Sequence, residues 1–310
     1  MATNKPASFL SDFSFVKLPF GFYLLGSLII ILFSFIGQVP MFFFLHPEGV
    51  SGTSQADLFG HLDTNLTLFL LLIPSLFAFF GFLFVIKSIH KQSLRSTTTS
   101  REKIDLKRIG FGFAYWALIS LGIFGVDLLL SPDDYQWNFN LQPFLLMLVI
   151  SVALIPFQSA LEEWIFRGYL MQGFATLTKS RFLTLVLTSV IFGSLHLFNP
   201  EIDQMGYGLL AYYIGTGFFF GIMSLMDEGI ELAIGFHVAN NLLTAILVTA
   251  DWTAFQTASL YKDISSPSLG SELLLFLGLI YPLSLFVLAK KYQWNDWRHK
   301  LISTIDATQT

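Results

Sequence analysis

The segment LQPFLLMLVISVALIPF, from Leu141 to Phe157, decides the fold class because it contains no charged residue. An α-helix that crosses the hydrocarbon core of a bilayer needs about 20 predominantly apolar residues. One residue later, SALEEWIFRG from Ser159 to Gly168 extends the apolar run but contains two glutamates and an arginine. The stretch therefore predicts a membrane helix in which a few charged side chains have a specific function.

The composition of the whole chain agrees with a membrane protein. The 310 residues are 54% hydrophobic and 12% charged, whereas soluble domains average about 25% charged residues. Cysteine is absent, which excludes disulfides, thiolate nucleophiles and cysteine metal sites. Since no basic stripe lies outside the loops, we expect no nucleic-acid partner.

Eight apolar runs are long enough to be transmembrane helices. They lie at about 19–45, 65–86, 109–130, 143–166 (helical to about 178), 182–199, 207–226, 230–249 and 270–289. The first run is longer than a signal-peptide core and lacks a small-residue cleavage site, so it counts as a true span. We therefore predict an all-α polytopic membrane protein with about eight transmembrane helices, in which residues 1–310 form a single transmembrane helical domain.

The distribution of lysine and arginine predicts the orientation of these spans. Basic residues gather before the first span, in the 86–108 loop, between the fourth and fifth spans, and after the eighth. The alternate loops are acidic, with Lys262 as their one basic residue. This pattern places both termini in the cytoplasm. The short loops and the absence of a retention signal favour a multi-pass protein of the bacterial plasma membrane.

Three groups of strongly polar residues interrupt the predicted spans. A charged side chain at the bilayer centre costs about 2.5–3.5 kcal/mol on insertion scales, so such residues usually line cavities. The groups are Glu162, Glu163 and Arg167; His196, in the motif that begins with Phe192; and His237, Asn240 and Asn241. Each group alone also fits an interhelical hydrogen bond, but together they carry acid–base and oxyanion chemistry.

Helical spacing separates the two glutamates. Glu163 and Arg167 are four residues apart and are expected to form an ion pair. Glu162 is rotated about 100° away, and its neighbours on that face are Gln158 and Tyr169. Glu162 is thus predicted to lack a local countercharge.

The spacing along the chain also predicts which groups meet. Glu162 lies 18 residues before Ser180 and His196 lies 16 residues after it, so an antiparallel hairpin would bring both to one height. His237 and Asn241 share a helix face. His196 and His237 differ by about 12 Å in their predicted distance from the nearest cytoplasmic turn. We therefore expect the hairpin between spans four and five to project into the cytoplasm, which would bring the two histidines to one level. We also expect the cavity that they line to open to the cytoplasmic leaflet.

The three groups resemble, in order and spacing, the motifs of the CPBP family of CAAX proteases and bacteriocin-processing enzymes, also called the ABI group. The resemblance covers the motif-bearing core, about residues 143–249. It implies an intramembrane endopeptidase that cleaves a peptide or membrane-protein substrate in the lipid bilayer. It further implies that Glu162 and His196 activate a water, that His237 and Asn241 stabilise the oxyanion, and that Glu163 and Arg167 give structural support.

Two alternatives to this interpretation remain open. Two histidines and a glutamate can bind a catalytic zinc ion, but the spacing His-Glu-x-x-His is absent, so we expect no metal or other cofactor. A non-catalytic membrane protein, such as a bacteriocin self-immunity factor or a transporter, would also place protonatable groups near the bilayer midplane.

Overall fold

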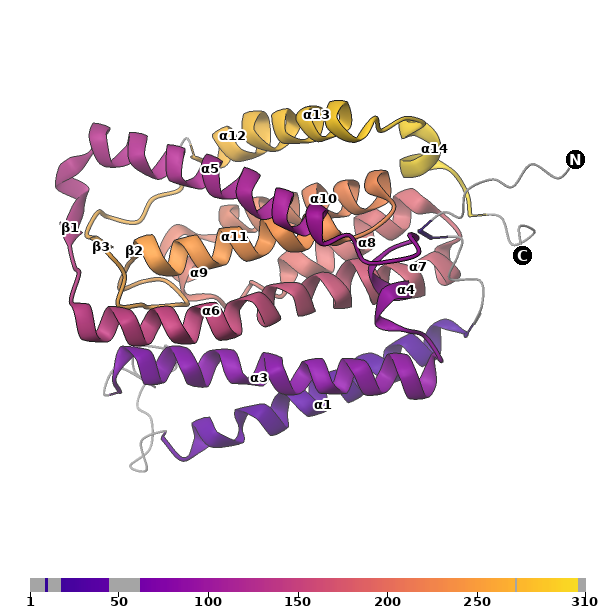
Figure 1. Ribbon diagram of the computed structural model, residues 1–310, viewed down its shortest axis with the longest axis horizontal. Helices are drawn as coiled ribbons and strands as arrows, with labels where there is room; N and C mark the ends of the chain where they lie inside the picture. The colour runs from indigo at the N-terminus through magenta and orange to yellow at the C-terminus, as the bar shows by residue number, and fades with distance from the viewer. Residues whose placement is uncertain (1–8, 11–17, 45–61, 271, 306–310) are drawn as a thin grey trace, which may run out of the picture.

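Long helices that run side by side make up most of the molecule (Figure 1). The structure, a computed structural model, describes residues 9–10, 18–44, 62–270 and 272–305. Its longer α-helices are α1 (Phe20–Phe42), α3 (Thr64–Phe84), α5 (Leu106–Leu130), α6 (Leu141–Glu163), α8 (Arg181–Ser194), α10 (Leu210–Asp227), α11 (Glu231–Leu247) and α13 (Tyr281–Tyr292). The predicted class of a helical membrane protein is confirmed.

Short elements connect these helices. They are α4 (Leu94–Thr98), α7 (Met171–Thr178), α9 (Pro200–Met205), α12 (Glu272–Leu275) and α14 (Trp297–Ile302), with 3-10 turns η3 (Pro132–Asp134) and η5 (Tyr207–Leu209) and π-helices η2 (Val85–Ile89), η4 (Trp164–Leu170) and η6 (Phe276–Ile280). In Figure 1, α1 and α3 lie along one edge of the molecule, and α12 and α13 lie along the opposite edge.

Six of the predicted spans are long enough and apolar enough to cross a membrane. They are 20–42, 64–89, 106–130, 141–178, 207–227 and 273–292. The other two predicted spans correspond to the shorter apolar helices α8 and α11. The number of eight spans and the cytoplasmic position of the termini therefore stay predictions.

The run predicted at 182–199 is not one helix, because α8 ends at Ser194. The backbone then continues through turns in which the His196 and Leu197 amides bond to carbonyls three residues back. A proline disfavours helical backbone in the residue before it, and Pro200 begins the new helix α9. His196 consequently lies in a turn rather than inside a span.

The helix that carries the two glutamates is continuous for 38 residues, from Leu141 to Thr178. Its middle part, η4, is a π-helix that begins directly after Glu163. Such local π segments are frequent at functional sites, and this one was not predicted. The helix ends at Lys179, which has a left-handed backbone with φ of 50°.

Helix α11 lies in the interior of the molecule, between α5 and α6 (Figure 1). Every residue from Glu231 to Ala239 is buried. A side chain at Gly235 would meet the backbone of α5, because an added Cβ would stand 2.2 Å from the Ile109 carbonyl oxygen. Glycine therefore allows the two backbones to approach closely, two residues before His237.

A small sheet, which was not predicted, joins three loops at one end of the bundle (Figure 1). Its strand order is β1 (Tyr135–Trp137), β3 (Tyr261–Asp263), β2 (Val248–Thr249), with β3 antiparallel to β1 and parallel to β2. The rings of Trp137 and Tyr261 pack with centroids 5.0 Å apart. β1 pairs with residues of β3 that are more than 100 positions away, and β2 pairs in parallel with β3 after a short connection, so no hairpin pattern in the sequence indicates the sheet.

Candidate active site

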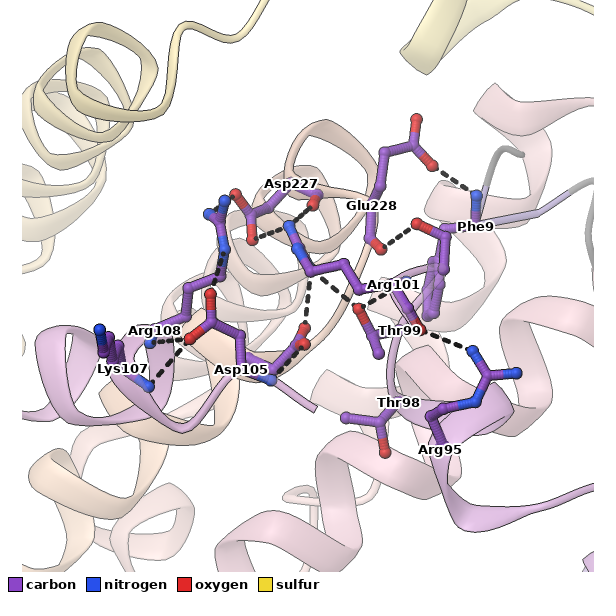
Figure 2. A network of polar contacts seen from close by, with 12 residues as sticks. Phe9, Arg95, Thr98, Thr99, Arg101, Asp105, Lys107, Arg108, Asp227 and Glu228 are labelled. Carbon is purple, nitrogen blue, oxygen red and sulfur yellow. Dashed lines mark hydrogen bonds and ion pairs between the residues drawn. The ribbon is translucent and has the colours of Figure 1, made fainter. Parts of the chain in front are cut away.

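The turn between α10 and α11 is held by two arginines, Arg101 from the loop that precedes α5 and Arg108 from the first turn of α5. Arg101 contacts Asp227 at 3.0 Å and Glu231 at 3.1 Å, and Arg108 contacts Asp227 at 2.6 Å. Figure 2 shows both arginines reaching Asp227. Since Glu231 is the first residue of α11, these ion pairs fix the start of the helix that carries His237 and Asn241.

The predicted ion pair between Glu163 and Arg167 is present and almost fully buried. Arg167 Nη1 donates to Glu163 Oε1 at 2.8 Å, and the side chains are 1% and 0% exposed. The guanidinium also donates to the Gly217 carbonyl at 3.2 Å and lies 4.3 Å from the Phe192 ring centroid. Arg167 therefore links the first motif to the second motif and to α10.

The ring of His237 lies between the two glutamates, which was not predicted. Its Nδ1 is 2.8 Å from Glu163 Oε1, and its Nε2 is 3.7 Å from Glu162 Oε2. Because a carboxylate accepts hydrogen bonds, the contact with Glu163 assigns a proton to Nδ1. Glu163 therefore orients the His237 ring in addition to pairing with Arg167.

The carboxylate of Glu162 contacts an amide rather than a cation. Gln158 Nε2 donates to Glu162 Oε1, and among the described residues no lysine or arginine lies within 4.0 Å of Glu162. The Glu162 side chain is 30% exposed. It is thus more open and less neutralised than Glu163.

Asn241 is connected to the same amide. Its Nδ2 donates to Gln158 Oε1 at 3.2 Å and to Ser159 Oγ at 3.1 Å. Its Oδ1 accepts from Asn240 at 3.1 Å, and Asn240 accepts from Trp116 Nε1 at 3.1 Å. A polar chain therefore runs across the interface between α6 and α11 and on to α5.

His196 is held in place by its own turn and by α10. Its Nδ1 lies 2.9 Å from the Phe192 carbonyl oxygen, so Nδ1 carries the proton in this contact and Nε2 of the neutral ring keeps a lone pair. Its ring stacks on Tyr213, with centroids 4.1 Å apart and an interplanar angle of 17°. No hydrogen bond joins His196 to Glu162 among the described residues.

His196, His237 and Asn241 line one cavity of about 70 Å³. A cavity of this size and polarity can hold water. Much of the remaining wall is aromatic, and Tyr212, Tyr213 and Thr216 come from the first two turns of α10. These turns lie at the end of α10 away from Asp227. The structure does not show where the bilayer lies, so the predicted access from the cytoplasmic leaflet stays a prediction.

In the part of the chain that the structure describes, no three histidine, aspartate or glutamate side chains form a group suited to a metal ion. Nδ1 of His196 and Nδ1 of His237 each already contact an oxygen of the protein.

Two residues of the site had no predicted role. Gln158 was recognised as a neighbour of Glu162, and its position four residues earlier on the helix is a local signal for the contact. Tyr213 gives no such signal, because it reaches His196 from another helix.

The comparisons with known proteins concern the region that contains this site. Residues 141–243, which include all three motifs, match the family described as type II CAAX prenyl endopeptidase Rce1-like. The uncharacterized protein YyaK of Bacillus subtilis strain 168 is 31% identical over 188 residues. That match covers 60% of this chain and 63% of the length of YyaK. No solved structure matches the chain.

Proposed function

We propose that the chain is an intramembrane endopeptidase, because residues 141–243 match the Rce1-like family, in agreement with the CPBP resemblance. It hydrolyses a peptide bond in a peptide or membrane-protein substrate. The observation that carries this proposal is the cavity that brings His196, His237 and Asn241 together, with Glu162 beside the His237 ring.

The first step is the activation of a water molecule by Glu162 and His196. Glu162 has no lysine or arginine partner among the described residues and is partly exposed, so its carboxylate can accept a proton from water. The His196 Nε2 lone pair can accept a hydrogen bond from the same water. The resulting hydroxide attacks the carbonyl carbon of the scissile bond, and the proton passes to the departing amine. General base catalysis of this kind contributes about 10²–10⁴-fold.

The second step is the stabilisation of the tetrahedral oxyanion by His237 and Asn241. Both hydrogens of the Asn241 amide are engaged by Gln158 and Ser159, so one of these bonds is exchanged when the oxyanion forms. Donation from His237 Nε2 requires a second proton on the ring, for which Glu163 is the countercharge. Loss of one oxyanion donor lowers kcat by about 10²–10³-fold in other hydrolases, and we expect this for Asn241→Ala.

A reconstituted cleavage assay tests the proposed function. The purified protein in phospholipid vesicles is given a quenched fluorescent peptide with a prenylated cysteine followed by three residues, the substrate class of the family description. Wild-type protein should cleave it and Glu162→Gln should not. A proteomic comparison of membranes containing either protein extends the search to other substrates. If neither experiment distinguishes the two proteins, the proposal is wrong.

Chelation separates the proposed mechanism from the zinc alternative. A water activated by Glu162 and His196 needs no metal, so cleavage should survive extensive treatment with a chelator. Loss of activity that is restored by zinc would favour the zinc-dependent enzyme.

We also propose that the chain is one multi-pass domain with eight spans, cytoplasmic termini and a position in the bacterial plasma membrane. The basic loop that supplies Arg101 and the sheet that follows Asp134 lie at opposite ends of the bundle (Figure 1). A reporter inserted after Arg101 should be cytoplasmic, and one inserted after Asp134 should be external. The reverse result would contradict this topology.

A further inference from the structure

Gln158 makes polar contacts with two of the proposed catalytic residues. Its Nε2 donates to Glu162 Oε1, and its Oε1 accepts from Asn241 Nδ2 at 3.2 Å. The same oxygen accepts from Ser159 Oγ at 3.1 Å. One amide thus lies between the proposed base and one of the proposed oxyanion donors.

The chemistry of these partners sets the orientation of the Gln158 amide. An ionised carboxylate can only accept hydrogen bonds, so the NH₂ group must face Glu162. The amide oxygen then faces the NH₂ group of Asn241, which can only donate. A residue with only donors or only acceptors would not satisfy both sides.

We propose that Gln158 is a positioning residue that holds Glu162 and Asn241 in one fixed arrangement. Glu162 lies one turn along the same helix, whereas Asn241 is on α11, so the amide also couples the two helices at the site. The catalytic part of this inference rests on the proposed function. The contact itself does not, because it can be tested without substrate.

The kinetic test compares Gln158→Met with Gln172→Met, a matched control on the same continuous helix. Gln172 also makes a hydrogen bond within its own helix, to the Gly168 carbonyl. Its side-chain oxygen accepts a hydrogen bond from Gln92, so these contacts are not with the proposed catalytic residues. Gln158→Met should lower kcat about tenfold, the effect of about 1.4 kcal/mol, with little change in KM. Gln172→Met should leave kcat unchanged. Equal kcat values for Gln158→Met and wild type, or equal losses in both variants, would overturn the proposal.

Gln158→Glu tests the contact with Glu162 apart from the contacts with Asn241 and Ser159. The glutamate keeps an oxygen for Asn241 and Ser159 but turns an acceptor toward Glu162. If both contacts matter, kcat should fall at least as far as in Gln158→Met. A near-normal kcat would show that the contact with Glu162 has no positioning role.

A substrate-independent measurement keeps this inference distinct from the proposed function. An apolar carbodiimide labels carboxyl groups in membranes, and mass spectrometry reports the rate at Glu162. Without its amide partner, the carboxyl group is free to move and should react more than about twofold faster in Gln158→Met, but not in Gln172→Met. If labelling responds and no peptide is cleaved, the proposed function fails and the Gln158–Glu162 contact stands. If labelling is unchanged, the positioning role is wrong.

Discussion

Two clusters of buried charges hold this protein together, and they differ in how completely their carboxylates are neutralised. At the turn between α10 and α11, Asp227 contacts two arginines and Glu231 contacts one. Around His237, Glu163 has Arg167, but Glu162 has only the Gln158 amide and the more distant His237 ring. Burying a carboxylate without a countercharge is costly.

The difference teaches which carboxylate is available for chemistry. The two arginines that contact the turn are 25% and 19% exposed, so water also reaches them. Arg167 is 1% exposed and fully engaged with Glu163, the Gly217 carbonyl and the Phe192 ring. Glu162 is therefore the carboxylate that can gain and release a proton with the least disruption of the surrounding contacts.

The largest expected effect comes from replacing that carboxylate. Glu162→Gln should lower kcat by about 10²–10⁴-fold because it removes the general base. The amide is nearly isosteric and breaks no ion pair with an arginine, so the melting temperature in detergent should stay close to that of the wild type. Cleavage rate and thermal stability, measured on one preparation, test this. If Glu162→Gln is active, Glu162 is not the general base, and the lack of an arginine partner does not mark the catalytic carboxylate.

Glu163→Gln should mainly destabilise the protein. Removing one partner of a buried pair costs about 3–5 kcal/mol, since Arg167 would remain as an unpaired charge. The double variant Glu163→Gln with Arg167→Met should recover part of this loss. The contact between Glu163 and His237 predicts that kcat of the double variant stays low although its stability improves. Thermal melts beside kcat for both variants distinguish these effects, and a fully stable but inactive Glu163→Gln would reverse the roles assigned to the two glutamates.

Asp227→Asn should weaken the other cluster and affect stability alone. We expect a loss of about 2 kcal/mol, less than for a fully buried pair because both arginine partners are partly exposed. The control is Asp105→Asn, whose side chain is 34% exposed and pairs with Arg108, and which should cost less than about 1 kcal/mol. Turnover per folded molecule should be unchanged in both variants. A selective loss of kcat in Asp227→Asn would show that the turn takes part in catalysis.

Ser159→Ala should have the smallest effect. It removes one of the two acceptors of the Asn241 amide, at 3.1 Å, which corresponds to a loss of about 1 kcal/mol or a roughly fivefold lower kcat. Ser151→Ala, on the same helix but bonded to the Met147 sulfur, serves as the control and should leave kcat unchanged. If the two serine variants behave alike, the hydrogen bond to Asn241 does not contribute to turnover.

Several features of this protein were predictable from the sequence because they depend on local geometry. Apolar runs of sufficient length predicted the helical spans, and six of them meet the length and hydropathy requirement. The pair of Glu163 and Arg167 was predictable because residues four apart on a helix are neighbours. The break before Pro200 was missed, although the Asn-Pro dipeptide indicates it. The motif residues themselves were also identified from the sequence alone.

The contacts that make a site from these residues were decided by the tertiary structure. His237 lies between two glutamates that are 74 and 75 positions away, and Tyr213 reaches His196 from another helix. Such contacts depend on how each helix rotates and slides against its neighbours. Helices that are apolar on nearly every face carry little information about that rotation. The sequence by itself therefore determined which chemical groups are present in the membrane, and the packing of α6, α10 and α11 determined which of them meet.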